Sequence, residues 1–405
     1  MKRINKIVLC CILTFITIIP LSACKSEQEK PSTTESERNK LYLSGGSCYY
    51  NDMYFNTGMR IPRDRNSYTL EYVLFDSDDL VKLPVYSDAF DENSDPFLGQ
   101  SNSSQILVDE EATRNNNGIP VLIVASTVRN EDGAWQDTFV SFNMATNRLT
   151  LIRSLSERIY GKFALLGDTI YYSVFLGDPD SLDMTGEYAY YRMSKNGGNP
   201  ERLPFPETER LPYTIKYVYN GKLYLVCEQI GKAYRCNPDF TQMEIVWESF
   251  PKSSPVAFHN GYAYYETNFR TVSTDNGVNV ECFDYFKTPV ENMSEEHSEM
   301  VLEDVLWVLH ASDHSSEVYY NSLDDLQIST ISLVPTHSIL KSLNLETGKE
   351  VVVFDYSAQS EPFYTTMYCN DKYCAIMIIN HPDYPLGAYL LNRETGELKL
   401  FDGFN

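Results

Sequence analysis

The chain has 405 residues, of which 56 are acidic and 33 are basic, giving a formal net charge of −23. A surface this acidic repels the phosphate backbone of nucleic acids, so we expect no nucleic-acid partner. Basic proteins, cations and cationic polymers are the partners that such a charge favours.

The first residues have the pattern of an export signal. Lys2, Arg3 and Lys6 precede an apolar run over residues 7–19. That run is shorter than the roughly 20 residues that cross a bilayer as a helix. A charged start, an apolar middle and a small-residue end are typical of a signal peptide, which we assign to residues 1–23.

Residues 21–24, with the sequence LSAC, resemble the lipoprotein box of bacterial cell-envelope lipoproteins. The resemblance implies cleavage before Cys24 and a diacylglyceryl group on its thiol. It therefore implies a lipid anchor in the cell membrane and an extracytoplasmic location. An ordinary signal peptide with a chance cysteine is the alternative.

Residues 24–40 are expected to form a lipidated cysteine followed by a disordered tether. The stretch 25–40 (KSEQEKPSTTESERNK) contains no large apolar residue. Ordering it would cost more conformational entropy than burial could offset. The folded domain is therefore expected over residues 41–405.

Pairs of adjacent tyrosines recur in segments that look like strands. In LGDTIYYSVF (166–175), Tyr171 and Tyr172 would point to opposite faces of a strand. Both faces are then expected to be buried, because a sheet with one wet face would expose one of the rings. Related segments are 46–52, 220–226, 260–266 and 316–322.

Two kinds of hairpin alternate along the domain. A tight turn precedes each tyrosine-rich strand, and the markers are Gly46, Gly118, Gly167, Gly221, Gly261, Ser315 and Asp371. A second hairpin follows, as in 139–152, 190–203, 339–354 and 389–401. Four antiparallel strands repeated about every 40 to 50 residues are typical of a β-propeller blade. The sequence thus predicts an all-β propeller of seven four-stranded blades, with six or eight left open.

The Thr-Gly turns at 345–349 and 393–397 resemble those of YVTN-type and TolB-like bacterial propellers. The resemblance implies the propeller fold and carries no function with it. Two stretches fit the repeat poorly. Residues 57–117 are too long for one step, and residues 290–304 could hold a helical turn.

The connections differ in length between the two ends of each predicted blade. The turns joining first to second and third to fourth strands are short, whereas several joining second to third strands are long. Long loops on one side of a scaffold often carry function, although tolerated surface insertions are the alternative. The long connections are 56–66, 128–137, 176–187, 267–279 and 322–337.

The long connections contain the candidate binding residues. Three arginines stand out in an acidic protein, Trp135 is an aromatic among polar residues, and two aspartates lie in the acidic loop 176–187. Arginine and tryptophan are typical of interaction hot spots. Pairing of the arginines with acidic loops, and folding of Trp135 back onto its blade, are the alternatives. The set is Arg60, Arg63, Arg65, Trp135, Asp178 and Asp180, with Lys195 and Lys349 as control positions on the short turns.

No cofactor is predicted, and calcium is the one ion with a candidate loop. Asp91, Asn93 and Asp95 begin like a calcium-binding loop. Pro96 replaces the usual glycine and Asn102 replaces the bidentate glutamate, so a solvated acidic loop explains the same residues.

A second group has the side chains that bind zinc. His310, Asp313, His314 and Glu317 surround one proposed turn. Only a folded geometry could bring them together, and an ordinary polar turn is the alternative.

Six cysteines follow the tether, an even number that permits disulfides outside the cytoplasm. Cys227 and Cys236 would oppose each other across a hairpin if Gly231 and Lys232 formed a two-residue turn. The sequence leaves open whether they form a disulfide or stay reduced.

No catalytic residue is predicted, because the chain lacks the G-x-S-x-G, H-E-x-x-H and P-loop motifs. We expect a lipid-anchored extracytoplasmic β-propeller that acts as a binding or scaffolding module for a protein or glycan partner. The alternative is an envelope enzyme that acts on glycan or peptide at the propeller axis. A solute-binding lipoprotein would show alternating strands and helices, which this sequence does not.

Overall fold

The computed structural model describes residues 41–43, 47–50, 53–56, 68–74, 80–87, 105–129, 135–176, 187–206, 211–250, 257–274, 277–310, 316–328, 335–357, 363–369, 372–379, 385 and 387–401. All of them belong to one unit of the chain, residues 39–405. Within these ranges the protein is nearly all β, with one α-helix, α3 (Glu110–Asn115).

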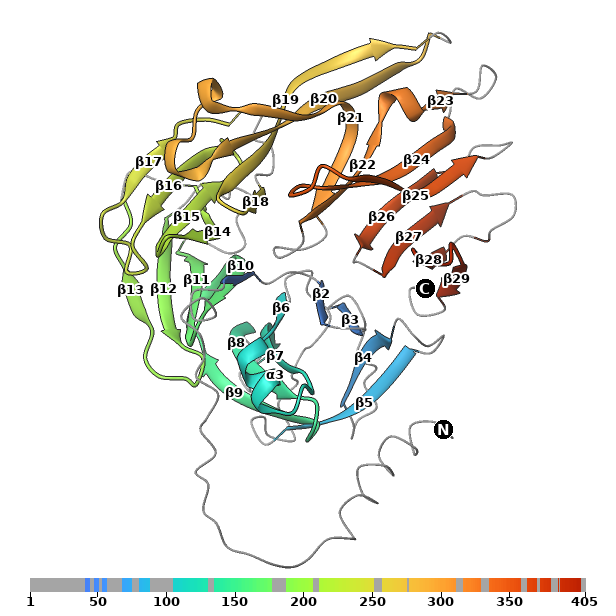
Figure 1. The fold of residues 1–405 in the computed structure, drawn as a ribbon. Coiled ribbons are helices and arrows are strands. Elements are labelled where there is room, and N and C mark those ends of the chain that lie inside the picture. Colours follow the sequence, from blue (N-terminus) through green and yellow to red (C-terminus); the bar gives the residue numbers. More distant parts are fainter. Residues whose placement is uncertain are drawn as a thin grey trace, which may run out of the picture. The chain divides into compact units, whose positions relative to one another are not determined.

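The described strands form five sheets (Figure 1). The first has the order β1 (Leu41–Leu43), β10 (Arg158–Leu166), β11 (Thr169–Phe175), β12 (Tyr188–Ser194) and β13 (Glu201–Leu203). The second has the order β14 (Thr214–Tyr219), β15 (Lys222–Cys227), β16 (Lys232–Cys236) and β17 (Glu244–Trp247). The third contains β18 (Ala257–His259), β19 (Tyr262–Ser273), β20 (Asn279–Pro289), β21 (Glu299–His310), β22 (Glu317–Ser322), β24 (Pro335–Asn344) and β23 (Gln327–Ile328), with β25 (Glu350–Ser357) paired to β24.

The fourth sheet has the order β2 (Ser47–Tyr50), β3 (Met53–Asn56), β4 (Tyr68–Leu74), β5 (Leu80–Ser87), β9 (Arg148–Ser154), β8 (Trp135–Asn143), β7 (Val121–Arg129) and β6 (Gln105–Val108). The fifth has the order β26 (Phe363–Cys369), β27 (Tyr373–Ile379), β28 (Gly387–Asn392) and β29 (Leu398–Phe401). Three short 3₁₀ turns are also described: η2 (Val290–Asn292), η3 (Glu295–His297) and η4 (Leu323–Asp325).

Consecutive strands pair antiparallel in groups of four, and the two eight-stranded sheets each join two such groups. β5 and β9 meet in parallel at Tyr86 and Ser87. β21 pairs with β20 through its first half and with β22 from Val305 to His310 through its second half. In each group, the first–second and third–fourth connections therefore lie at one end of the sheet, and the second–third connection lies at the other.

Both faces of the tyrosine-rich strands are buried, as predicted. Tyr171 belongs to a core shared with β14–β16, whereas Tyr172 packs in a core shared with β6–β8. The side chains from Ile170 to Val174 are all buried. Adjacent tyrosines are thus each covered by a different neighbouring sheet, which explains why the sequence can place them side by side.

One backbone hydrogen bond recurs in five of the groups. The N–H of the residue after the third strand donates to the C=O of the residue before the second strand, at 2.7–3.1 Å. This bond joins the connection after the third strand to the connection before the second strand. It also fixes the backbone position of the donor residue, and with it the starting point of that residue's side chain. The donors are Met144, Lys195, Val290, Leu345 and Arg393, and their acceptors are Pro120, Asp168, Gly261, Ser316 and Lys372.

Several connections differ from the sequence prediction. Residues 267–279 form a long hairpin rather than a loop, because β19 extends to Ser273 and β20 begins at Asn279. In the range 128–137, β7 continues to Arg129 and β8 begins at Trp135, and the residues between them lie outside the described ones. Gly46 precedes β2, so that marker stands before the first strand of its group and not before the second. The helical turn considered for residues 290–304 is present as η2 and η3.

Among the described residues, no helix has the length and apolar character needed to cross a membrane.

Candidate functional site

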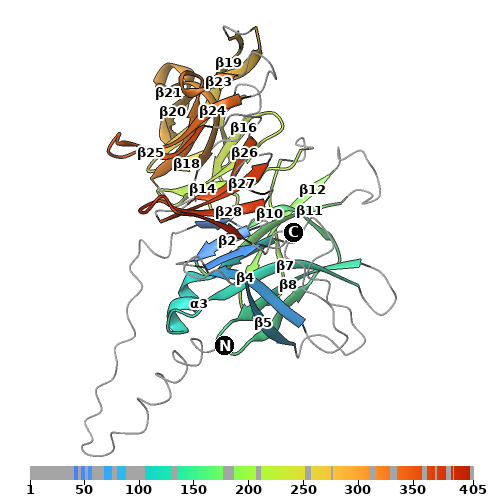
Figure 2. The same cartoon turned by 90° about the vertical axis from the view of Figure 1, so that its right-hand side faces the viewer.

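The candidate site is built where α3 follows β6 (Figure 1), and Figure 2 shows α3 beside β7 and β8. Asp109 is the N-cap of α3, and its Oδ1 accepts the N–H of Ala112 at 3.0 Å. Glu110 and Glu111 then occupy the first turn, where acidic side chains stabilise the helix dipole. The buried Thr113 hydroxyl accepts the N–H of Val121 at 2.9 Å, which fixes the helix on β7.

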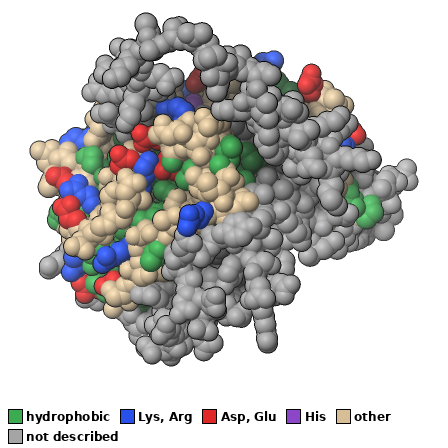
Figure 3. All heavy atoms as spheres, turned by 90° about the horizontal axis from the view of Figure 1, so that it is seen from below, with side chains coloured by type: hydrophobic (Ala, Val, Ile, Leu, Met, Phe, Trp, Pro, Cys, Tyr) green, Lys and Arg blue, Asp and Glu red, His purple; other side chains and the backbone are tan. Residues whose placement is uncertain are grey.

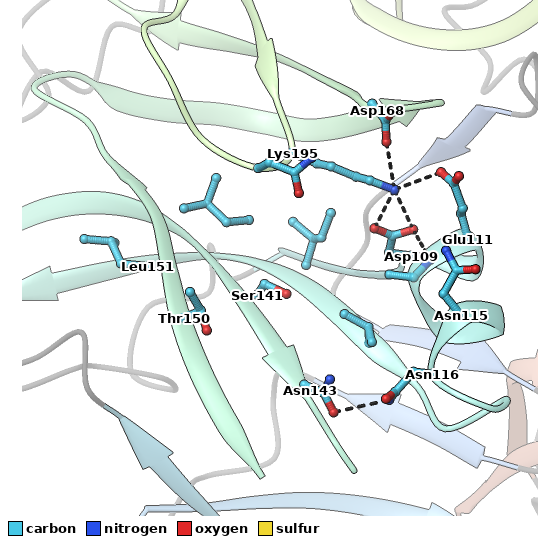
Figure 4. A pocket seen from close by; sticks show the side chains of 15 residues that line it. Asp109, Glu111, Asn115, Asn116, Ser141, Asn143, Thr150, Leu151, Asp168 and Lys195 are labelled. Atoms are coloured by element: carbon cyan, nitrogen blue, oxygen red, sulfur yellow. Dashed lines mark hydrogen bonds and ion pairs between the residues drawn. The ribbon is translucent and has the colours of Figure 1, made fainter. Parts of the chain in front are cut away.

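Lys195 reaches this helix from the next group of strands. Its Nζ lies 3.0 Å from Asp109 Oδ2, 3.1 Å from Glu111 Oε2 and 3.1 Å from Asp168 Oδ1 (Figure 4). Lys195 and Asp109 have side chains only 10% and 5% exposed, whereas Glu111 and Asp168 are 44% and 68% exposed. One ammonium group therefore faces three carboxylates, and two of the three remain accessible to solvent.

Lys195 stays protonated in this environment. Burial alone would lower its pKa, but Asp109, Asp168 and Glu111 together raise the pKa above its ordinary value. A lysine held in its charged form donates hydrogen bonds and does not serve as a base.

A pocket of about 660 Å³ opens beside this cluster (Figure 4). That volume lies within the range of about 300–1,000 Å³ typical of small-ligand sites. Asn116 Nδ2 donates a hydrogen bond to Asn143 Oδ1 at 3.2 Å, which joins the C-terminal end of α3 to the end of β8. The remaining lining combines amide, hydroxyl and aliphatic side chains, among them Asn115, Ser141, Thr150, Leu151, Ile152 and Asn196.

Arg393 provides an internal comparison, because it occupies the same position of the repeat as Lys195. Its Nη1 donates to Glu317 Oε2 at 2.9 Å and to the hydroxyl of Tyr319 at 2.8 Å. Its side chain is 12% exposed. Arg393 thus pairs with the carboxylate of Glu317, whereas the Lys195 ammonium lies against the carboxylates of Asp109, Glu111 and Asp168.

One face of the molecule, seen in Figure 3, carries charges of both signs in its described part. Acidic and basic side chains lie among polar ones there, and neither sign forms a continuous patch.

Most residues predicted from the sequence lie outside the described residues. These are the anchor residue Cys24, the binding candidates Arg60, Arg63, Arg65, Asp178 and Asp180, the calcium candidates Asp91, Asn93 and Asp95, and the histidine-turn residues Asp313 and His314. Trp135 was expected in a loop, but it is the first residue of β8 and lies opposite Arg129. The hairpin continues further than the polar sequence suggested.

Cys227 and Cys236 do not have the register that a turn at Gly231 and Lys232 would give. Cys227 lies opposite Lys232 and Cys236 lies opposite Leu223, and both cysteines are buried thiols. The turn runs from residue 228 to residue 231, so it is longer than the assumed two-residue turn. The longer turn shifts the register and separates the two side chains.

The two described members of the histidine turn bind different partners. His310 Nε2 hydrogen-bonds the hydroxyl of Tyr285, whereas Glu317 pairs with Arg393. Within the described ranges, no three side chains of the metal-binding types are grouped as they would be around an ion.

The sequence contains a pattern that points to this site, although the sequence analysis did not use it. Lys195 follows a third strand, at a position that holds Met144, Val290 or Leu345 in other groups. A basic residue in place of an apolar one, together with the acidic run 109–111 after the preceding first strand, indicates an ion pair between neighbouring groups. Lys195 had been considered only as a control position.

No protein-family model matches the chain, and no curated protein matches it in sequence. Among solved structures, it is similar to one from a study of two prolyl endopeptidases, with 13% identity, 90% of this chain and 50% of that chain covered, and a TM-score of 0.51. The nidogen/laminin complex has 11% identity, 64% and 88% coverage and a TM-score of 0.35. The tricorn protease has 10% identity, 69% and 34% coverage and a TM-score of 0.32. The first likeness shows the fold alone, a propeller-type arrangement of antiparallel sheets, and this chain spans half the length of that protein.

Proposed function

We propose that this chain is a lipid-anchored, extracytoplasmic β-propeller that acts as a binding module, with the pocket beside Lys195 as its ligand site. The ligand carries a positively charged group, such as the ammonium or guanidinium of a basic peptide or of an amine-bearing glycan. The observation that carries this proposal is the excess of carboxylates around one ammonium group at the pocket.

Seven blades are the arrangement that the strand pairing supports best. Over the described ranges, the four-stranded groups are β2–β5, β6–β9, β10–β13, β14–β17, β18–β21, the group of β21, β22, β24 and β25, and β26–β29. β21 is counted twice, because its two halves pair with different groups. Two-sided burial of the strands agrees with blades stacked against one another.

Two features favour a location outside the cytoplasm. The sequence LSAC at residues 21–24 matches a lipoprotein box. Cys374 is disulfide-bonded, and its register partner on β26 is Cys369. Disulfides persist in oxidising compartments, so this bond is expected in an exported protein.

The charge balance selects the ligand class. Lys195 neutralises one of the three carboxylates, which leaves the pocket with an excess negative charge next to the accessible Glu111 and Asp168. A cation entering the pocket is attracted by this excess, and an anion is repelled. The enzyme alternative has less support, because Lys195 stays protonated and the likeness to an endopeptidase extends to the fold alone.

Titration calorimetry with trilysine tests the proposal. The wild-type chain should bind trilysine, and trilysine affinity should fall with rising salt concentration. The double variant Glu111→Gln, Asp168→Asn should bind it at least about tenfold more weakly, because the two solvent-accessible carboxylates that attract the cation lose their charge.

The matched control is the double variant Glu201→Gln, Glu244→Gln, which removes two exposed carboxylates that pair with Arg192 and Arg235 away from the pocket. It should bind trilysine as the wild type does. Equal losses in both double variants, or wild-type binding of triglutamate in preference to trilysine, would contradict the assignment of the site.

A further inference from the structure

β1 is the first strand after the predicted tether, and it joins a group of strands that is distant in sequence. Leu41, Tyr42 and Leu43 pair with Leu166, Leu165 and Ala164 of β10. Leu41 is buried in the core shared by β10–β12 and β14–β16. Tyr42 packs on the opposite side, against the core shared with β6–β8. A segment of three residues therefore touches both cores that flank β10.

Tyr42 also connects β1 to the helix beside the pocket. Its hydroxyl donates to Glu110 Oε2 at 2.9 Å. Burial and the adjacent Glu110 carboxylate raise the pKa of Tyr42, so the hydroxyl keeps its proton and remains the donor. The hydrogen bond to an ionised carboxylate is stronger than one between neutral groups.

The residues next to Glu110 in α3 belong to the proposed ligand site. Glu110 lies between Asp109, which caps α3, and Glu111, and both of these side chains hold Lys195. Because α3 is short, a shift of its first turn moves both carboxylates relative to Lys195. The position of Tyr42 is thus linked to the geometry of the pocket through one turn of helix.

We propose that β1 is a latch on the pocket, which acts through Tyr42 and the first turn of α3. When β1 is docked on β10, Tyr42 holds α3 in the ligand-binding arrangement, and when β1 detaches, the first turn of α3 is released. This coupling rests on the proposed function of the pocket as a ligand site. Coupling of this kind is reciprocal, so a ligand in the pocket also stabilises docked β1.

The short pairing makes detachment of β1 accessible. β1 contributes three residue pairs to its sheet, whereas β11 and β12 share seven. Short segments at the edge of a sheet open locally at a lower free energy than the strands of the core.

Amide hydrogen exchange of the full chain tests the latch without any ligand. Tyr42→Phe removes the hydroxyl and keeps the ring. It should speed exchange of the Thr113 and Asn116 amides of α3 about tenfold, because a hydrogen bond to a charged group is lost. Tyr265→Phe is the matched control, since it removes a hydroxyl that donates to Ser298 Oγ at 2.8 Å. The control should leave exchange in α3 unchanged.

Lys195→Met tests the coupling in the reverse direction, from the pocket to β1. Because coupling is reciprocal, we expect this variant to speed amide exchange at Leu41–Leu43 about threefold. Exchange in β14–β17, which reports general stability, should stay unchanged. No change in α3 with Tyr42→Phe, or no change at Leu41–Leu43 with Lys195→Met, would overturn the latch. A failure of trilysine to bind the wild-type chain would instead overturn the ligand site and leave these exchange results to decide the latch.

Discussion

A single backbone position has different roles in different groups of strands. The residue after the third strand donates the same backbone hydrogen bond in five groups, so its side chain starts from an equivalent backbone position in each of them. At this position, Met144 and Val290 have buried apolar side chains. Arg393 pairs with Glu317 there, and Lys195 lies against three carboxylates beside a pocket. The backbone is conserved within the molecule while the chemistry of the side chain changes, which is how a repeat acquires one special site.

Stability at low pH should depend on His310. Burial, with a smaller contribution from His259, lowers the pKa of His310 from 6.5 to about 3. The folded chain therefore keeps this histidine neutral, while the unfolded chain takes up a proton below about pH 6.5. The stability is complete above that pH and is lost progressively as the pH falls toward 3, by about 3 kcal/mol at pH 4.5.

Urea unfolding between pH 4.5 and pH 7 measures this dependence. His310→Gln, which offers the Tyr285 hydroxyl an acceptor that does not titrate, should flatten the pH profile. His297→Gln, at an exposed histidine, should leave the profile as it is. An identical pH slope in the wild type and in His310→Gln would show that His310 is not responsible.

At the scale of elements, the sequence indicated which segments form hairpins better than where each hairpin turns. The pairs at 139–152, 190–203, 339–354 and 389–401 all form as predicted. The hairpin of β19 and β20 was expected to be a loop, because its outer half is rich in polar residues. Its strands pair as far as Ser273 and Asn279, and Arg270 Nη2 contacts Asp284 Oδ1 at 2.7 Å across the hairpin. Periodicity of apolar residues does not reveal such an ion pair.

The turn between β15 and β16 requires its glycine. Gly231 has a φ of +66°, and a Cβ there would lie 2.7 Å from the backbone N and O of Phe250. The N–H of Phe250 also donates to the C=O of Gly231 at 2.7 Å, so the two backbones cannot separate without losing this bond. Gly231→Ala should therefore lower the free energy of unfolding by about 3 kcal/mol or more, through the clash and the positive φ together.

Gly118→Ala is the matched control, because Gly118 has a φ of +79° with no atom near its would-be Cβ. It should cost about 1 kcal/mol from the backbone conformation alone. Equal costs in the two variants, measured by urea unfolding, would show that the contact with Phe250 is relaxed at little expense.

At the scale of the molecule, the all-β repeat could be predicted and the pocket could not. Tight turns, paired tyrosines and doubled apolar residues are local signals, and they recur often enough to indicate sheets buried on both faces. The pocket joins Asp109 to Lys195, which are 86 positions apart in the chain. It lies at the end of the sheets where most connections are short, but the connection 109–120 there is long and contains α3. Loop length had instead favoured the opposite end, and no local pattern states which two groups of strands will be neighbours.

Hydrogen exchange of the full chain with and without trilysine tests most directly whether the ligand binds at the Lys195 pocket. We expect trilysine to slow exchange in residues 109–116 and at the turn 195–196 and to leave the hairpin 267–279 unchanged. Protection of 267–279 or of the connection 323–328 at the opposite end of the sheets, with residues 109–116 unaffected, would contradict it.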